Sequence, residues 1–356
     1  MERWQITHGR CQEILATYPD NHFSAVITDP PYGLKFMGKA WDAQVPDVET
    51  WQAVLRVLKP GGHLLCFAGT RTQHRMAVNI EDAGFEIRDM IAWVYGSGFP
   101  KSHNISKAID KMAGQPQSTR YVPNNLNTTH GKGWGGGKTD TQTKPNTAGA
   151  KQWDGWGTAL KPALEPITVA RKPFASTVAA NVVEHGTGGL NIDAARIPGN
   201  VPKPGGRWPA NLIHDGHDEV MELFPDLGRA GVAGKNSGKN SWFGNGPGFL
   251  DSAQTYADAG SAARFFYCAK VAKKERTANG QVENKHPTVK PIALMRYLIK
   301  LVTPPGGVIV DPFCGSGSTL LAAVAEGVNA VGIDTDESSV TIARERLAVA
   351  LEALEG

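Results

Sequence analysis

Short apolar runs alternate with amphipathic segments along most of the chain. The runs are rich in β-branched residues and are bounded by Gly, Pro or Asp, which is typical of buried strands. Between them, apolar residues recur at helical spacing. The first predicted strand ends at Thr28, and the others cover 63–67, 87–95, 166–170, 211–213, 307–310 and 330–333. The predicted helices cover 48–58, 72–83, 291–302, 320–326 and 340–354. This alternation, without an internal repeat, predicts a doubly wound, Rossmann-like α/β sheet.

Two details of this pattern concern the connections. Lys59-Pro60-Gly61-Gly62 follows the helix at 48–58 and predicts a tight turn into the next strand. The strands at 87–95 and 166–170 are predicted to pair as a hairpin. Between them the pattern collapses from Gly96 to Ala159, where Asn, Thr, Gly, Gln and Lys dominate. We expect a mobile loop there, because the segment has too few apolar residues to bury.

Asp29-Pro30-Pro31-Tyr32 follows the first apolar run directly. The two prolines remove two backbone donors and fix φ, so the chain leaves the strand in a stiff turn. That turn presents a carboxylate, a carbonyl and an aromatic face, which together suit a planar base with an exocyclic amine. Asp29 and the Pro30 carbonyl can accept the amine hydrogens, and Tyr32 can stack on the ring. The tetrapeptide alone is equally compatible with an ordinary proline-rich turn.

A glycine-rich segment, Asp311 to Thr319, stands between a predicted strand and a predicted helix. Gly315 and Gly317 permit a tight turn and close approach to a ligand, and Ser318 or Thr319 can cap the helix. Asp334 ends the following strand, a position suited to a ribose diol. The segment itself lacks G-x-G-x-x-G, and no G-x-x-x-x-G-K-[ST] occurs in the chain, which weakens the alternative of a nicotinamide-dependent dehydrogenase.

Taken together, Asp29–Tyr32 and Phe313–Gly317 resemble the motifs of amino-methylating DNA methyltransferases, which use S-adenosylmethionine. A third segment, His286 to Pro291, is similar to the part of those enzymes that folds over the methionine end of the cofactor. The catalytic tetrapeptide precedes the cofactor motifs, as in the permuted beta group of this DPPY-type family. The resemblance covers the two ends of the chain, while the middle matches only in outline.

The resemblance implies a seven-stranded methyltransferase sheet with an antiparallel hairpin, S-adenosyl-L-methionine as cofactor and double-stranded DNA as partner. It implies that Asp29 and the Pro30 carbonyl orient the target amine without a covalent intermediate. The base would leave the duplex and stack on Tyr32. The catalytic residues are then Asp29, Pro30, Pro31 and Tyr32, and the cofactor-binding residues are Thr288, Lys290, Pro291, Asp311, Phe313, Cys314, Gly315, Ser316, Gly317 and Asp334.

The target base and the activity leave alternatives. Asp at the first position of the tetrapeptide resembles the adenine-N6 enzymes, whereas Ser leans toward cytosine N4, so adenine is favoured and cytosine is the alternative. A protein glutamine methyltransferase would usually have Asn there and the opposite motif order. A catalytically inactive DNA-binding homologue is disfavoured because Asp29, Tyr32, Gly315 and Gly317 are intact.

The distribution of charge along the chain is more informative than the net charge. The 356 residues carry a net charge of only +3, but residues 96–172 hold 11 Lys or Arg against 4 Asp or Glu, a local net of +7. Three tryptophans, Trp134, Trp153 and Trp156, lie among them. Basic and aromatic residues together suit phosphate contact and base stacking. The predicted DNA contacts are Lys132, Lys138, Lys151, Arg207 and Trp208.

The sequence also argues against several kinds of functional site. The four cysteines show no C-x-x-C spacing and no Pro-Cys pair, which argues against a zinc site, a disulfide framework and a covalent cysteine nucleophile; no metal is expected. No apolar run reaches the ~20 residues of a membrane helix, so we expect a cytoplasmic protein without a membrane partner. A homodimer is a possible oligomeric state. The expected organisation is a catalytic part at 1–95, a mobile basic DNA-contacting loop at 96–165, a sheet strand at 166–173, a target-recognition region at 174–262 and a cofactor-binding part at 263–356.

Overall fold

The computed structural model describes residues 3–34, 42–98, 102–117, 119–123, 139–198, 205–227, 260–269, 274–286 and 288–355. The chain forms two compact units. The larger unit combines residues 1–96 with 164–356, and the smaller unit covers residues 97–163. The predicted catalytic and cofactor motifs all belong to the larger unit.

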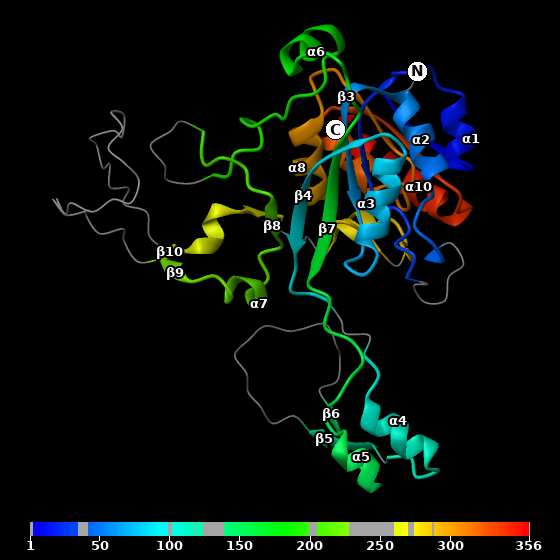
Figure 1. The fold of residues 1–356 in the computed structure, drawn as a ribbon, viewed down its shortest axis with the longest axis vertical. Coiled ribbons are helices and arrows are strands. Elements are labelled where there is room, and N and C mark those ends of the chain that lie inside the picture. The colour runs from blue at the N-terminus through cyan, green and yellow to red at the C-terminus, as the bar shows by residue number, and fades with distance from the viewer. Residues whose placement is uncertain are drawn as a thin grey trace, which may run out of the picture. The chain divides into compact units, whose positions relative to one another are not determined.

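A nine-stranded sheet forms the centre of the larger unit, in the order β1-β13-β12-β2-β3-β7-β4-β8-β11 (Figure 1). β7 runs antiparallel to both of its neighbours, β3 and β4, and the other pairs in the sheet are parallel. The strands are β1 (Trp4–His8), β2 (Phe23–Thr28), β3 (Leu58–Phe67), β4 (Glu86–Val94), β7 (Leu164–Arg171), β8 (Leu212–His214), β11 (Tyr267–Cys268), β12 (Val308–Asp311) and β13 (Asn329–Asp334).

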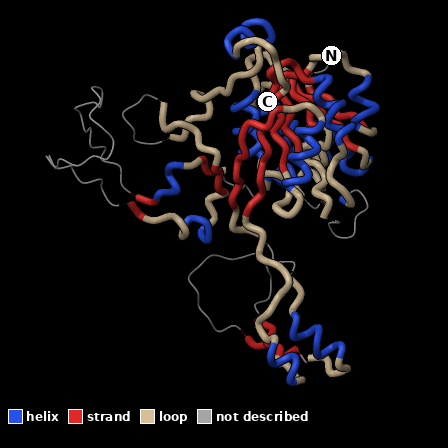
Figure 2. The backbone as a smooth tube through the Cα atoms, viewed as in Figure 1, coloured by secondary structure: helices blue, strands red, loops and turns tan. Residues whose placement is uncertain are grey.

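Helices cover both faces of this sheet (Figure 2). Alternate residues of the strands separate two cores: Ala25 and Ile27 pack with one set of helices, Val26 with the other. One core includes apolar residues of α8 (Ile292–Val302), α9 (Ser318–Ala325) and α10 (Glu337–Glu355). The other includes residues of α1 (Cys11–Ala16), α2 (Val48–Val57) and α3 (Gln73–Asp82). The predicted doubly wound α/β class is confirmed.

The predicted hairpin is also confirmed, because β4 and β7 pair antiparallel from Glu86↔Arg171 to Val94↔Leu164. The strand number is a correction. β8 and β11 add two short strands beyond β4, so the sheet has nine strands where the resemblance implied seven. β8 matches the strand predicted at 211–213, whereas β11 has only two residues and no strand was predicted there; β8 pairs with the β4 edge, and β11 pairs with β8.

The turn predicted at Lys59-Pro60-Gly61-Gly62 is wrong, because β3 begins at Leu58, directly after α2. The Gly61 N–H donates to the Lys172 carbonyl, and the Lys172 N–H donates to Gly62, so this segment is paired with the residue that follows β7. Gly61 has φ +76°, and a Cβ there would lie 2.3 Å from Asn181 Nδ2. The glycine is needed for close packing rather than for a free turn.

In the smaller unit, the described residues form helices and strands where the sequence predicted only a loop, while the expected mobility stays a prediction. The unit contains α4 (Ile105–Met112), α5 (Ala148–Gln152) and a hairpin of β5 (Thr119–Pro123) and β6 (Thr139–Thr143). The buried carboxylate of Asp110 joins its parts: it accepts hydrogen bonds from the backbone N–H groups of Asn146 and Thr147, from the Thr147 hydroxyl and from Gln117 Nε2, at 2.7–2.9 Å. A polar hub thus replaces the missing apolar residues.

Residues 174–262 do not form a compact unit of their own in the described part of the chain, since residues 164–356 cluster with the main sheet. They supply α6 (Val178–His185), α7 (Asp218–Met221), and the strands β9 (Asp226–Leu227) and β10 (Gly260–Ser261), which pair with each other. Two 3-10 helices, η3 (Ala262–Phe265) and η4 (Glu275–Gly280), follow. No described helix is long and apolar enough to span a membrane.

Candidate active site

Three neighbouring parallel strands, β13, β12 and β2, end at one edge of the sheet. Thr28 is the last residue of β2 and precedes Asp29, while Asp311 and Asp334 end β12 and β13. The carboxyl edge of a parallel sheet is where α/β proteins bind ligands. Segments nearly 300 residues apart in sequence therefore begin side by side.

A buried carboxylate links the first two of these strands. Asp311 accepts hydrogen bonds from the Thr28 hydroxyl at 2.6 Å and from the Thr319 hydroxyl of α9 at 2.5 Å. The Phe313 N–H also donates to it, at 3.1 Å. Burial raises the pKa of Asp311 to about 7, against the lowering effect of these hydrogen bonds. The carboxylate is turned into the protein, where it positions the loop after β12.

The turn after β2 is held by a residue that the sequence analysis did not select. The buried carboxylate of Asp42 accepts the backbone N–H groups of Tyr32, Gly33 and Leu34, at 2.6, 2.9 and 3.2 Å. Among the residues that the structure describes, none donates a hydrogen bond to the Pro30 carbonyl. The turn is thus rigid and keeps one strong acceptor available.

The side chains of the tetrapeptide form a compact cluster with two partners from elsewhere. The Lys290 ammonium lies 2.7 Å from Asp29 Oδ2 and 3.0 Å from Glu165 Oε2. The Tyr32 hydroxyl lies 2.7 Å from Asp29 Oδ1 and 2.9 Å from Glu165 Oε2. Lys290 also lies 4.8 Å from the centre of the Phe67 ring, within cation–π range.

These contacts fix the protonation of two members of the cluster. Burial raises the pKa of the Tyr32 hydroxyl, and the Asp29 and Glu165 carboxylates raise it further, so the hydroxyl keeps its proton. Burial alone would lower the pKa of Lys290, but the same two carboxylates raise it above its usual range. Lys290 is therefore a charged ammonium shared by two carboxylates.

The loop after β12 has the backbone that its glycines predicted. Gly315 and Gly317 have φ +49° and +84°. A Cβ on Gly317 would lie 3.0 Å from Ala343 Cβ, and one on Gly315 would lie 3.2 Å from the His286 ring. Gly317 is the N-cap of α9, and no side chain caps that helix, so the predicted cap by Ser318 or Thr319 is wrong. Thr319 instead donates to Asp311.

Buried side chains support the rest of this loop. Arg346 of α10 is fully buried and donates to both the backbone carbonyl and the hydroxyl of Ser316. Burial lowers the pKa of Arg346 to about 10. Cys314 is buried, which raises the pKa of its thiol. The Phe313 ring centre lies 6.3 Å from that of Trp51.

Asp334 lies next to the glycine loop and is half-buried. Its carboxylate accepts the N–H groups of Gly315 at 2.8 Å and Asp336 at 2.9 Å. Burial raises the pKa of Asp334. The Asp336 carboxylate is occupied by Ser338 and Ser339 at the start of α10. Asp334 keeps lone pairs free for a diol, whereas Asp336 serves as a helix cap.

The residues present fit a nucleoside cofactor with an amino-acid tail. Two left-handed glycines open the backbone, an acidic residue ends the neighbouring strand, and His286 lies over Gly315. His286 Nδ1 lies 2.6 Å from the Thr288 carbonyl, which holds the ring beside the loop. Pro291 is the N-cap of α8, and Lys290 precedes it. Pro287 lies outside the described residues.

The structure separates the predicted site residues into groups. Asp29, Tyr32 and Lys290 come together, although Lys290 was expected at the cofactor; it contacts the predicted catalytic residues instead. Phe313 to Gly317 and Asp334 come together at the ends of β12 and β13. Thr288 is exposed.

The predicted DNA contacts are more dispersed. Lys132 and Lys138 lie outside the described residues, and Lys151 is exposed in α5 of the smaller unit. Trp208 is exposed and lies under Arg196, whose guanidinium is 5.6 Å from the ring centre. Arg207 donates to the Arg264 carbonyl and lies 4.9 Å from the Phe265 ring.

Sequence reasoning missed Glu165, Asp42 and Arg346. Each is a charged residue whose environment depends on distant segments. Only Glu165 carried a local signal, since a carboxylate next to Pro166 begins an otherwise apolar strand. Among the described residues, no group of three or more His, Cys, Asp or Glu could hold a metal ion.

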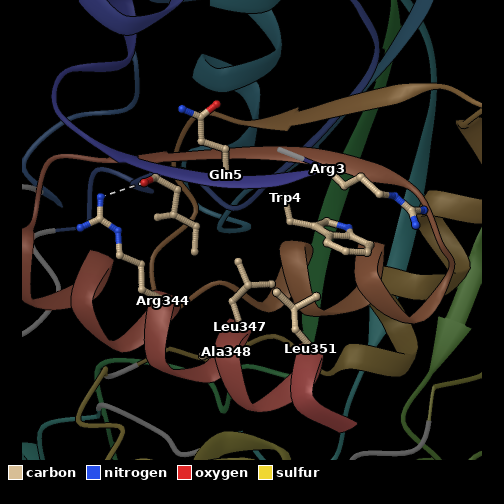
Figure 3. Close-up of a pocket in the computed structure, with 8 residues that line it drawn as sticks. Arg3, Trp4, Gln5, Arg344, Leu347, Ala348 and Leu351 are labelled. Carbon is tan, nitrogen blue, oxygen red and sulfur yellow. Dashed lines mark hydrogen bonds between the residues drawn. The ribbon is translucent and has the colours of Figure 1, made fainter. Parts of the chain in front are cut away.

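A separate groove of about 660 Å³ lies between β1 and α10 (Figure 3). It is lined by Arg3, Trp4, Gln5, Ile6, Arg344, Leu347, Ala348 and Leu351. In Figure 3, Trp4, Leu347 and Leu351 face one another across it, and Arg344 hydrogen-bonds the Ile6 carbonyl. None of the lining residues belongs to the motifs, so the groove gives no support to the chemistry at the β2 and β12 ends.

Fold and site together fit an α/β protein that binds a nucleotide cofactor and carries two hydrogen-bond acceptors, Asp29 and the Pro30 carbonyl, in the turn Asp29–Tyr32, here called the acceptor turn. A family model described as DNA methylase, of the N6 and N4 type, matches residues 23–345. The chain therefore belongs to this DNA methyltransferase family. Members of the family act on DNA and use S-adenosylmethionine, which confirms the class, the cofactor and the DNA partner predicted from the sequence.

Among individual relatives, the type II methyltransferase M.HindIII of Haemophilus influenzae is 22% identical over 306 residues, 85% of this chain and 68% of its own. The DNA adenine methyltransferase YhdJ of Escherichia coli is 38% identical over 65 residues, 18% of this chain and 22% of its own. The M1.HpyAVI–SAM complex gives a TM-score of 0.44 at 17% identity, covering 97% of this chain and 100% of that one. The cytosine-N4-specific PvuII methyltransferase gives 0.49 at 14%, covering 99% and 95%. At these scores the fold assignment depends on this chain's own sheet order.

The buried Asp311 carboxyl generates a prediction about stability. The pKa of Asp311 is raised to about 7 in the folded chain, whereas an unfolded aspartate titrates near 3.9. Because the folded state binds the proton more tightly, the free energy of unfolding falls as pH rises from about 4 to about 7. Asp311→Asn cannot ionise, so it should lose this dependence. Relative to wild type, the variant should gain on the order of 4 kcal/mol between these limits. Urea denaturation across this range measures it, and equal slopes for both proteins would contradict the assignment.

Proposed function

We propose that this protein transfers a methyl group from S-adenosylmethionine to the exocyclic N6 amine of an adenine flipped out of double-stranded DNA. The observation that carries the proposal is the hydrogen bond from Thr28 to Asp311 at 2.6 Å. It joins the residue before the acceptor turn to the residue that begins the glycine loop. An amine on the turn and a methyl donor on the loop would therefore be neighbours.

The chain's own groups act by orientation. The lone pair of an aryl amine is delocalised into the ring, so the nitrogen is a weak nucleophile. Two acceptors, Asp29 and the Pro30 carbonyl, can bind the two amine hydrogens and favour a pyramidal nitrogen with its lone pair directed at the donor. When bound, the sulfonium cofactor supplies an electrophilic methyl carbon. No covalent intermediate with the protein is needed.

A base in a duplex cannot reach a turn at the edge of a sheet, so it must leave the stack. We propose that the Tyr32 ring then replaces the lost stacking. Gly69 makes room for this ring, because a Cβ there would lie 3.1 Å from Tyr32 Cδ2. The smaller unit contributes exposed Trp153 and Trp156 and the exposed Lys151, which suit single bases and phosphates. Target recognition by residues 174–262, including Arg207 and Trp208, and a homodimer stay predictions.

The cofactor is proposed to lie over Phe313 to Gly317. Asp334 would accept the ribose hydroxyls, and Thr288 and Pro291 would lie near the methionine end. Lys290 belongs with the amine site in this proposal, because its ammonium contacts Asp29 and Tyr32. Asp311, Cys314 and Ser316 support the loop from below, since all three are buried.

The identity of the first residue of the acceptor turn, Asp29, favours adenine over cytosine as the target base. An Asp at this position resembles the tetrapeptide of the adenine-N6 enzymes. In addition, the Escherichia coli relative matched over 65 residues is named a DNA adenine methyltransferase. The test is to incubate unmethylated genomic DNA with the protein and labelled cofactor. Mass spectrometry of the nucleosides then distinguishes N6-methyladenine from N4-methylcytosine, and sequencing with modification detection gives the context. Detection of N4-methylcytosine without N6-methyladenine would overturn the choice of base. Detection of no modified base at all would overturn the proposed activity.

Asp29→Ala should abolish methyl transfer while cofactor binding stays nearly intact, because Asp29 faces the amine. Lys290 keeps Glu165 as a partner in this variant, so the fold should tolerate the change. Turnover and calorimetric cofactor affinity measure the two effects. Asp20→Ala is the matched control, since that aspartate is exposed and its ion pair contributes little. Retention of more than about a tenth of wild-type turnover would contradict the orientation mechanism.

Asp334→Ala should raise the KM for the cofactor and leave kcat at saturation largely unchanged, because the removed contact is to the bound ribose rather than to the reacting atoms. Steady-state kinetics at several cofactor concentrations measure this. Asp336→Ala is the companion variant, since Asp336 lies two residues away and caps α10. A rise in KM for Asp336→Ala alone would move the ribose contact to that residue.

Replacing Lys132, Lys138 and Lys151 with alanine should weaken DNA binding and preserve site preference. Each lost phosphate contact should reduce the magnitude of the slope of log affinity against log salt by roughly 0.9. Fluorescence anisotropy with cognate and unrelated duplexes at several salt concentrations measures both quantities. An unchanged slope would show that the phosphate contacts lie elsewhere, for example in residues 174–262.

A further inference from the structure

Glu165 is a charged residue in the second position of β7, beside the acceptor turn. Its side chain is 18% exposed, and Lys290 and Asp29, its neighbours, are 9% and 21% exposed. Glu165 Oε2 lies 3.0 Å from the Lys290 ammonium and 2.9 Å from the Tyr32 hydroxyl. Burial raises the pKa of Tyr95, the residue that follows β4, and the Glu165 carboxylate raises it further. A carboxylate is thus fixed opposite Asp29, with the same two donors between them.

Two donors, Tyr32 and Lys290, are shared between two carboxylates, Asp29 and Glu165. Tyr32 has one hydroxyl hydrogen and two carboxylate oxygens within reach, at 2.7 Å for Asp29 and 2.9 Å for Glu165. It can donate to only one of them at a time. Lys290 has three hydrogens and lies near Asp29, Glu165 and the Tyr32 oxygen. In the DNA-free chain, Tyr32 and Lys290 reach Oδ1 and Oδ2 of Asp29 respectively.

This arrangement conflicts with the role of Asp29 toward an amine. Each Asp29 oxygen keeps a second lone pair, but the ammonium or the hydroxyl that it already accepts weakens it as an acceptor for an amine hydrogen. Releasing Lys290 with no other partner would leave a buried, unpaired ammonium, which is costly. Glu165 removes that cost, because it accepts both donors without moving the backbone.

We infer that Glu165 is a positioning residue that takes the Lys290 ammonium and the Tyr32 hydroxyl when the target amine binds Asp29. The inference rests on the proposed function, since it assumes that an exocyclic amine docks on Asp29. In the free protein the two carboxylates share the donors; in the complex Glu165 holds them and Asp29 holds the amine. The exchange forms and breaks hydrogen bonds only, and Lys290 stays charged throughout.

Glu165→Gln is the first test, because it keeps the size of the side chain and removes its charge. Lys290 should then stay paired with Asp29, and the amine should compete less well. Loss of a charge-assisted hydrogen bond of this kind should lower single-turnover rate and kcat by about ten- to a hundredfold. Cofactor affinity, measured by calorimetry, should stay within about twofold of wild type, since Glu165 does not lie on the glycine loop. Glu165→Asp keeps the charge and should recover part of the rate.

Glu86→Gln is the matched control. Glu86 lies at the other end of the same β4–β7 hairpin, where its carboxylate pairs with Arg171 at 2.6 Å. It loses a comparable ion pair without touching Asp29, so its kcat should equal that of wild type. Thermal unfolding of every variant separates a loss of fold from a loss of rate.

Glu165→Gln combined with Lys290→Gln tests the mechanism of the effect. If Glu165 acts by holding Lys290, its removal should cost much less once Lys290 is uncharged, so the two effects should not multiply. Multiplicative effects, a Glu165→Gln variant with wild-type kcat, or a kcat that falls only in step with thermal stability and cofactor affinity would each overturn the inference. A wild-type protein that methylates no DNA amine would instead overturn the proposed function.

Discussion

The carboxylate of Asp311, which accepts hydrogen bonds from Thr28 and from Thr319, connects the acceptor turn, the glycine loop and α9. Thr28 precedes the acceptor turn, Asp311 begins the glycine loop, and Thr319 lies in the first turn of α9. Because all three side chains are buried, the hydrogen bonds are shielded from water and hold the two loops at a fixed separation. Methyl transfer requires this fixed separation, since its nucleophile and its electrophile come from two different ligands.

Burying a carboxyl group at this point has a consequence for charge. Asp29 follows Thr28 directly, so a second ionised carboxylate would lie next to it, and Asp29 contributes to the raised pKa of Asp311. The Lys290 ammonium forms an ion pair with the Asp29 carboxylate and a second ion pair with the Glu165 carboxylate. Asp29, Tyr32, Glu165 and Lys290 therefore form an electrostatic network contributed by the turn after β2, by β7 and by the segment before α8. Its order depends on all three.

The order of the motifs along the chain places few limits on the site. The acceptor turn precedes the glycine loop by most of the chain's length, but β2 and β12 are adjacent and parallel in the sheet. A doubly wound sheet presents the carboxyl ends of its strands at one edge regardless of which strand comes first. The chain can therefore insert long polar segments between the motifs without disturbing their geometry. The smaller unit, held together by Asp110 instead of an apolar core, is such an insertion.

Local pattern by itself determined most strands and helices around the sheet, though not β1, α1 or β11, together with the β4–β7 hairpin, the left-handed glycines of the loop and the position of Asp29 after β2. Periodicity, proline and glycine act within a few residues, so these features need no distant partner. The tertiary structure alone decided that Lys290 pairs with Asp29, that Glu165 completes the cluster, and that Asp42 and Arg346 support the two loops. It also decided that a polar segment folds around Asp110 and that β8 and β11 extend the sheet. Each of these depends on a charged, polar or backbone group finding a partner far along the chain, and no local pattern encodes which partner a fold will bring within 3 Å.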